Sequence, residues 1–248
     1  MRSASSAIGF FFVIILITLI YKLPANFVYQ QLPQSNVIQL NGIVGSIWSG
    51  RVDTINTQQV TFNNLNWQLS AWSLLVGDID VQWALVDDAV NLQGNIKLSG
   101  DNIQIHNLEG QIDLLELGGK ITEQPVVLGG QVIVDVGYVE IEDKQLIDVS
   151  GLVEWKSAMI VSPENVELGE FKAVLSNDSD QLLAMLSDTD GAVELQGDFN
   201  LSPTGTYSYA INIGIRDTSV PGLLDGFNQL GKQDYNGRIT LQANDRLF

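Results

Sequence analysis

Side chains that commonly carry catalysis or bind metals are sparse in this chain of 248 residues. His106 is the only histidine, and there is no cysteine. A zinc site needs several histidine, cysteine or carboxylate ligands, and a cysteine nucleophile or a disulfide needs a thiol. No nucleophile motif accompanies His106, so we interpret it as a surface or edge histidine. The sequence predicts no metal site and no cofactor.

Two pairs of neighbouring carboxylates, Asp87/Asp88 and Glu140/Glu142, have the residue type that glycosidases use. A retaining glycosidase holds its two carboxyl groups about 5 Å apart across one cleft, and an inverting enzyme about 6.5–9.5 Å apart. Adjacent residues point to opposite faces of a strand, whereas Glu140 and Glu142 share a face. Because exposed charges on strands are far commoner than catalytic pairs, we predict that the chain has no catalytic residues and is not an enzyme.

The segment Asp188-Thr189-Asp190-Gly191 resembles the start of a calcium-binding loop. An EF-hand loop needs oxygen ligands at its first, third and fifth positions and glycine at its sixth. Asp188 and Asp190 fit the first and third positions, but Ala192 and Val193 occupy the fifth and sixth. We therefore predict a hairpin turn here.

The charge of the chain limits its partners. The formal net charge is −17, from 12 basic and 29 acidic residues, and the acidic residues are scattered rather than clustered. Such a surface repels phosphate backbones and anionic head groups, which disfavours nucleic-acid binding and docking through a polybasic patch. The hydrophobic content of 45% indicates a folded chain.

The elements of the chain begin with an apolar run near the N-terminus. Between Arg2 and Lys22 there are 19 uncharged residues, and about 20 apolar residues cross a hydrocarbon core of roughly 30 Å. The predicted anchor residues are Ile8, Phe10, Phe11, Phe12, Ile14, Ile15, Leu16, Leu19 and Ile20. The run therefore predicts a single transmembrane helix.

We predict that this helix is an uncleaved signal anchor. The alternative is a secretory signal cut after Ala25, but Leu23 would then occupy a position that favours small residues. Only Arg2 and the terminal amine precede the span, which favours a cytoplasmic N-terminus and an external C-terminal domain. The predicted organisation is a stub and anchor over 1–24, a linker over 25–36 and a β domain over 37–248. We expect the linker to continue the anchor helix briefly and to end it before Pro33.

From Val37 onward, apolar residues alternate with polar ones, as in Leu65, Trp67 and Leu69 or in Val90 and Leu92. This period of two is typical of antiparallel strands with one buried and one wet face. Only Pro221 to Leu230 indicates a further helix. The predicted fold class is mainly β: a curved antiparallel sheet, either an open gutter or a roll, with a short helix near the C-terminus.

An internal similarity suggests two duplicated halves, over 37–125 and 126–205. VNLQGNIKLS (90–99) resembles VELQGDFNLS (193–202), and LNWQLSAW (65–72) faintly resembles VEWKSAM (153–159). The alternative is that two amphipathic strands look alike by chance. The shared glycines, Gly94 and Gly197, lie mid-strand, where glycine marks a bulge, a bend or a close backbone approach.

The densest aromatic cluster lies between Gly42 and Trp83 and contains the candidate packing or interaction residues. These are Gly45, Trp48, Gly50, Trp67 and Trp72. Large amphipathic aromatics pack one face of a sheet, and they are also frequent in the centres of binding interfaces. Both interpretations remain open from the sequence alone.

Three ordered motifs resemble a known family. They are Gly45 to Arg51 (GSIWSGR); Trp67, Leu69, Leu74, Leu75 and Gly77; and Phe227, Leu230, Gly231, Gly237, Arg238 and Ile239. Together with the N-terminal anchor, they resemble protein N of the bacterial type II secretion system over nearly the whole chain. The resemblance implies a single-pass inner-membrane protein with a periplasmic β domain, an accessory part of the apparatus that exports folded proteins across the outer membrane. It implies no catalytic residues.

The expected partners are other secretion subunits, either the outer-membrane secretin or the inner-membrane platform, bound through an exposed strand edge or the aromatic face. The chain is also similar, more distantly, to AsmA-like β proteins, which implies an alternative role as a periplasmic carrier of lipid or other hydrophobic cargo. A carrier requires a continuous apolar groove open to solvent, whereas a scaffold fills its concave face with its own side chains.

Overall fold

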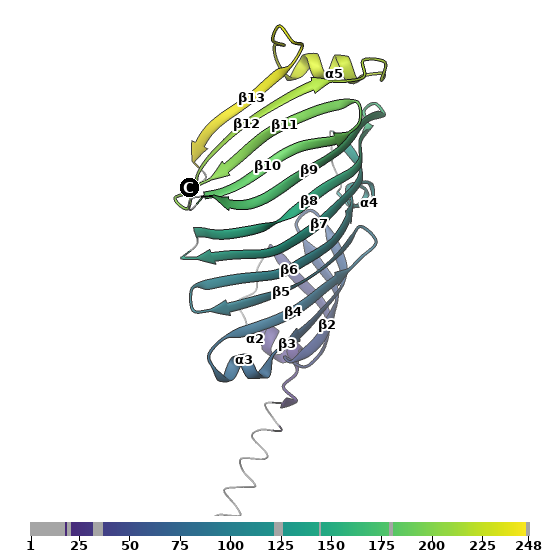
Figure 1. Ribbon diagram of the computed structural model, residues 1–248. Helices are drawn as coiled ribbons and strands as arrows, with labels where there is room; N and C mark the ends of the chain where they lie inside the picture. Colours follow the sequence, from purple (N-terminus) through teal and green to yellow (C-terminus); the bar gives the residue numbers. More distant parts are fainter. Residues whose placement is uncertain are drawn as a thin grey trace, which may run out of the picture.

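The computed structural model describes residues 18, 21–31, 37–121, 126–143, 145–178 and 181–246. These residues form one antiparallel sheet in which each of thirteen strands pairs with its neighbours in sequence (Figure 1). The strands are β1 (Ile38–Gly45), β2 (Ser49–Thr57), β3 (Thr61–Leu69), β4 (Ile79–Val86), β5 (Val90–Ser99), β6 (Asn102–Asp113), β7 (Val127–Glu142), β8 (Gln145–Ser162), β9 (Val166–Asp178), β10 (Gln181–Asp190), β11 (Val193–Leu201), β12 (Thr206–Ile215) and β13 (Ile239–Arg246). The prediction of a mainly β protein with an open antiparallel sheet is confirmed.

Four helices accompany the strands in the described part of the chain. They are α2 (Ala25–Gln31), α3 (Ala71–Leu75), α4 (Leu114–Gly119) and α5 (Leu223–Leu230). The predicted C-terminal helix is confirmed as α5, although it begins two residues after Pro221. Its N-cap, Gly222, has a φ of 75°, which glycine adopts without steric cost.

The predicted membrane anchor, from Ile8 to Ile20, lies outside the described residues except for Thr18. No helix among the described residues combines the length and the apolar character that a membrane span requires.

The linker is helical over α2, which ends before Pro33 as predicted, but α2 does not continue the helix that contains Tyr21. Tyr21 is helical, but the helix is interrupted before α2, and Pro24 instead forms an antiparallel bridge with Ser46. Proline disfavours the α conformation of the residue before it, here Leu23, and has no N–H to continue the helix. The Pro24 carbonyl then accepts the first hydrogen bonds of α2, from the N–H groups of Phe27 and Val28.

The sheet has an apolar face and a polar face, and a bulge in β6 keeps them in phase. Residues paired across strands share a face. Gln93 pairs with Glu109 and Asn95 pairs with His106, so Glu109 and His106 share the polar face although they are three residues apart. The extra residue is accommodated at Asn107, whose φ is 52°.

The core lies where α5 covers the apolar face. Val166, Val193 and Leu223 form its buried cluster, and Phe227 of α5 is only 4% exposed. Burying a side chain of this size contributes about 1.5–3 kcal/mol. The C-terminal helix therefore closes the sheet at its β9–β12 end.

The similar segments 90–99 and 193–202 correspond to strands β5 and β11, which supports their local resemblance. Gly94 lies at the register shift between β5 and β6, and a Cβ on Gly197 would lie 2.7 Å from the Ile211 Cα, so both glycines occupy positions of the predicted kind. The upstream segments differ: β3 precedes β5 by two strands, whereas β8 precedes β11 by three. Strands β6 and β7 also pair across the proposed boundary at residue 125. Duplication of the two halves stays a prediction.

Candidate interaction surfaces

A row of tryptophan and glycine crosses the apolar face from β2 to β5. Gly50 pairs with Trp67, Trp67 with Trp83, and Trp83 with Gly94. A Cβ on Gly50 would lie 2.5 Å from the Trp67 Cζ2, so glycine is required beneath the indole ring. The Trp67 Nε1 donates to the Ile47 carbonyl at 3.2 Å, which attaches β3 to the turn between β1 and β2.

The structure brings four of the five candidate aromatic-cluster residues together and separates the fifth. Gly45 and Gly50 are cross-strand partners at the β1–β2 turn, and half-buried Trp48 lies between them. The Trp48 carbonyl accepts from the Leu69 N–H at 2.7 Å, next to the end of β3. Trp72 lies in α3, and its side chain is 81% exposed. Trp83 and Gly94 complete the row. They are recognised as members of it only from the pairing of β3, β4 and β5, which the sequence alone does not reveal.

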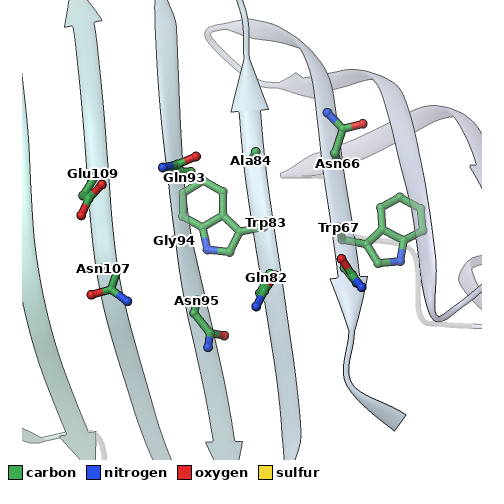
Figure 2. A pocket seen from close by; sticks show the side chains of 11 residues that line it. Asn66, Trp67, Gln82, Trp83, Ala84, Gln93, Gly94, Asn95, Asn107 and Glu109 are labelled. Atoms are coloured by element: carbon green, nitrogen blue, oxygen red, sulfur yellow. The ribbon is translucent and has the colours of Figure 1, made fainter.

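The polar face of β3–β6 carries a dense group of amide side chains (Figure 2). They surround an open hollow of about 440 Å³ whose lining includes Asn66, Gln82, Gln93, Asn95, Asn107 and Glu109. Such a surface offers many hydrogen-bond donors and acceptors but only one carboxylate.

Within each carboxylate pair considered for catalysis, the two side chains have different surroundings. Glu140 accepts from the Asn102 Nδ2 at 2.8 Å and from the Gln104 Nε2 at 3.0 Å. These bonds, with one from Tyr138, lower the pKa of Glu140, while burial and the nearby Glu140 carboxylate raise the pKa of Tyr138. Glu142 is exposed at the end of β7.

Asp87 is the centre of a buried polar contact. Its side chain is fully buried, and its carboxylate pairs with the Lys120 ammonium at the C-cap of α4. Asn63 donates to the same carboxylate from its main-chain N–H and its side-chain amide, both at 3.0 Å. Burial alone raises the pKa of Asp87, but the hydrogen bonds outweigh it and the net pKa is lowered. Asp87 thus joins β3, the β4–β5 turn and α4.

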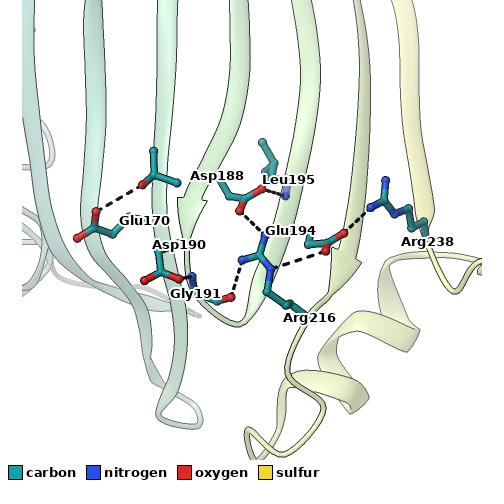
Figure 3. Close-up of polar contacts among 9 residues, drawn as sticks. Glu170, Asp188, Asp190, Gly191, Glu194, Leu195, Arg216 and Arg238 are labelled. Carbon is teal, nitrogen blue, oxygen red and sulfur yellow. Dashed lines mark hydrogen bonds and ion pairs between the residues drawn. The ribbon is translucent and has the colours of Figure 1, made fainter.

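The Asp188–Gly191 segment forms the end of β10 and its turn into β11, as predicted, and takes part in an ion-pair network (Figure 3). The Arg216 Nη2 lies 2.7 Å from the Asp188 Oδ2, and its Nη1 donates to the Gly191 carbonyl at 2.8 Å. Glu194 pairs with both Arg216 and Arg238. Among the described residues, no group of three His, Cys, Asp or Glu side chains is arranged to hold a metal ion.

The apolar face is hollowed between the sheet and helices α4 and α5. The hollow has a volume of about 600 Å³, within the range of ligand pockets in proteins. Its lining is almost wholly apolar and includes Val132, Trp155, Phe171, Leu195, Ile213 and Phe227.

The two edges of the sheet differ in protection. The Tyr29 hydroxyl of α2 accepts from the Leu40 N–H at 3.1 Å, and this N–H points away from β2. Hydrogen-bonded pairs alternate along antiparallel strands. The Ser202 N–H donates to the Thr206 carbonyl across the β11–β12 turn, so the even residues of β12 bond to β11 and the odd residues bond to β13. The odd residues of β12 pair with the odd residues of β13. The main-chain groups of Thr240, Gln242 and Asn244 therefore point outward. Their side chains are exposed, and no hydrogen bond covers these outward groups in the described part of the chain.

An open sheet with one apolar face, one amide-rich face and one uncovered edge defines a β protein suited to binding over extended surfaces. Residues 36–242 match the family described as Type II secretion system (T2SS), protein N, and the chain therefore belongs to this family. The predicted resemblance is confirmed.

Two relatives carry the same description, "Type II secretion system protein N". The protein of Aeromonas hydrophila is 27% identical over 236 residues, which cover 92% of this chain and 93% of the relative. The protein of Vibrio cholerae serotype O1 is 29% identical over 77 residues, which cover 30% of this chain and 31% of the relative. No solved structure matches the chain.

The C-terminal motif residues that suggested the family have structural roles near α5. Arg238 pairs with Glu194, and Ile239 is only 2% exposed. Gly231 lies against the Ile239 side chain, from which an added Cβ would be 3.3 Å away.

Proposed function

We propose that the chain is an interaction component of the type II secretion apparatus that takes part in the export of folded proteins across the outer membrane. In this proposal the N-terminal segment anchors it in the inner membrane and the β domain lies in the periplasm. Family membership and the apolar N-terminal run support the proposal. The observation that carries it is the unequal protection of the two sheet edges.

The edge at β1 is covered in part, at Leu40 and beside its end at Ser46, whereas the edge at β13 is open. Natural proteins blunt free edges with bulges, prolines or lysines, because exposed main-chain groups recruit other strands. β13 pairs with β12 in unbroken register and contains neither proline nor lysine. A partner segment can add to β13 through the main chain of Thr240, Gln242 and Asn244.

The open edge lies at the end of the sheet away from the N-terminal segment (Figure 1). With strands about 4.8 Å apart, the twelve spacings between thirteen strands measure about 58 Å along the curved sheet from β1 to β13. A chain anchored before β1 would therefore offer β13 to a subunit farther from the inner membrane. We propose that this partner supplies an extended segment with apolar side chains on the side of Leu241 and polar ones opposite.

The test uses the full chain in cells with a photo-reactive residue at position 244, an exposed position on the outward edge of β13. Covalent capture of another secretion subunit, identified by mass spectrometry, is the expected result. Gln242→Pro removes an outward N–H but no bond to β12, so it should reduce capture about tenfold while the fold persists. Gln242→Thr keeps the N–H and is the matched control. Equal capture by Gln242→Pro and Gln242→Thr, or capture of a second copy alone, would contradict the proposal.

A carrier of lipid or other hydrophobic cargo is the second candidate function, favoured by the 600 Å³ apolar hollow. Ala173 of β9 lines the hollow, and a larger side chain there would occupy its volume. For a carrier, native mass spectrometry of the purified protein should reveal a bound acyl-chain ligand that Ala173→Trp loses. Met185→Trp, at a 57% exposed position, is the control. A ligand-free wild-type protein would rule against this candidate.

A further inference from the structure

The loop between β3 and β4 exposes a patch of large apolar side chains. It comprises α3 and the two residues after it, and we call residues 71–77 the Trp72 loop. Trp72, Leu75 and Val76 are 81%, 76% and 78% exposed, and the loop sequence AWSLLVG contains no charge. Single exposed apolar residues are ordinary, but a contiguous apolar patch marks an interaction site.

The Trp72 loop is held in a fixed conformation. Ser70 caps α3 by accepting from the Ser73 N–H, and the two hydroxyl groups lie 3.0 Å apart. The Ser73 carbonyl accepts from the Asp78 N–H at 2.9 Å, and Ser70 donates its own N–H to the Asp80 carbonyl at 2.8 Å. The apolar side chains are therefore presented to the surroundings by a capped and closed turn.

The loop lies at the end of the sheet where the N-terminal segment joins it. The Ile47 N–H donates to the Leu23 carbonyl at 3.0 Å, and the Leu69 N–H donates to the Trp48 carbonyl at 2.7 Å. These two bonds connect the segment before α2, the β1–β2 turn and the last residue of β3, which precedes the loop by two positions. Figure 1 shows α2 and α3 at the same end of the molecule.

Other exposed aromatic side chains accompany the loop at this end. Tyr21, immediately before the interruption at Pro24, is 70% exposed, and Phe27 of α2 is 57% exposed. Tryptophan and tyrosine are enriched at membrane–water interfaces, where the ring is half apolar and half wet.

We propose that the Trp72 loop lies in the head-group layer of the bilayer that the N-terminal anchor crosses. The inference rests on the anchor of the proposed function and adds a second membrane contact to it. Charge favours this site over other surfaces: the net charge of −17 repels anionic head groups, whereas the loop carries no charge. Asp78, at the base of the loop, is paired with Lys97 at 3.0 Å. Two contacts would hold the first strands at a fixed height above the membrane.

The absence of cysteine makes this proposal directly testable by site-directed spin labelling. The full chain carrying Leu75→Cys is labelled with a nitroxide and reconstituted into vesicles of phosphatidylethanolamine and phosphatidylglycerol. We expect the label at position 75 to lose its accessibility to a water-soluble nickel reagent and to gain accessibility to oxygen, which dissolves in lipid. Met185→Cys, at a 57% exposed position on β10, is the matched control and should stay accessible to nickel.

The outcomes separate this inference from the anchor on which it rests. If the chain resists carbonate extraction while position 75 remains as accessible to nickel as position 185, the loop proposal is wrong and the anchor stands. If carbonate extracts the chain, the anchor and the loop contact are both wrong. Shielding of position 75 from both reagents would indicate contact with another copy of the chain and would likewise overturn the proposal.

Discussion

At the scale of single residues, polar side chains near strand ends hold the fold together. Asp87 is an example. In the sequence it is only one of two adjacent aspartates, and nothing there indicates that it forms a buried ion pair. Its fully buried carboxylate pairs with Lys120, which is 33 positions further along the chain. Sequence patterns predict which residues face inward, but they do not predict a contact of this separation. The same limit applies to the Trp67–Gly50 contact, which depends on strand register.

We predict that Asp87→Asn lowers stability by about 2 kcal/mol, because the Lys120 ammonium loses its buried anionic partner. For a chain of this size, that corresponds to a fall of roughly 4–8 °C in the thermal midpoint. Asp88→Asn, at an exposed neighbouring position, should change the midpoint little. Calorimetry of both variants at pH 7 tests the prediction, and equal midpoints would contradict it.

The pH dependence of this difference follows from the lowered pKa of Asp87. A carboxyl group whose pKa is lower in the folded than in the unfolded state stabilises the fold above its ordinary pKa, about 3.9. This contribution is lost as the pH falls through the folded value. We expect the gap between wild type and Asp87→Asn to be constant from pH 7 to about pH 5 and to shrink below about pH 4. If the stability difference between wild type and Asp87→Asn grew on acidification, the pKa of Asp87 would be raised in the folded state rather than lowered.

At the scale of elements, alternation in the sequence predicted the strands but not their irregularities. In β6 the apolar residues Ile103 and Ile105 are odd-numbered, whereas Leu108 and Ile112 are even-numbered. This change of phase is itself a signal of a bulge, and asparagine at the changeover tolerates the left-handed conformation that Asn107 adopts. The helix interruption at Pro24 was also indicated by its sequence. The hollow beneath α5 was not indicated by the sequence, because it depends on the distance between α5 and the sheet.

The bulge provides a prediction about β6 as a whole. Deleting Asn107 should force one side of the strand to change faces, because a one-residue slip inverts every side chain. Either Ile103 and Ile105 or Leu108 and Ile112 would then lie on the polar face. We expect the deletion to abolish cooperative unfolding. Asn107→Gly retains a residue at this position, and glycine adopts the left-handed conformation readily, so this variant should unfold near the wild-type midpoint. Circular dichroism during heating distinguishes the two, and a cooperative deletion variant would refute the role of the bulge.

At the scale of the whole molecule, the first edge of the sheet is partly covered and the last edge is open. The sequence predicted an open antiparallel sheet, but it could not identify which edge is free. That distinction arises from α2, whose Tyr29 hydroxyl accepts from the outward N–H of Leu40, and from Pro24 just before α2, which bridges to Ser46. A sheet with one free edge can accept one partner strand and then stop, whereas a sheet with two free edges can associate head to tail without end.

We therefore predict that α2 prevents self-association of the sheet. A protein comprising residues 21–248 should not polymerise, because β1 remains protected and pairing through β13 alone stops at two copies. A protein comprising residues 38–248 exposes the outward main chain of β1, and its β1 and β13 edges should pair between copies into open polymers. Tyr29→Phe in the longer protein removes only the hydroxyl group and should produce a small increase in association. Sedimentation velocity over a range of concentrations measures all three. If residues 38–248 remained monomeric, α2 would not be what protects β1. The proposed difference between the β1 edge and the β13 edge would then lose its physical basis.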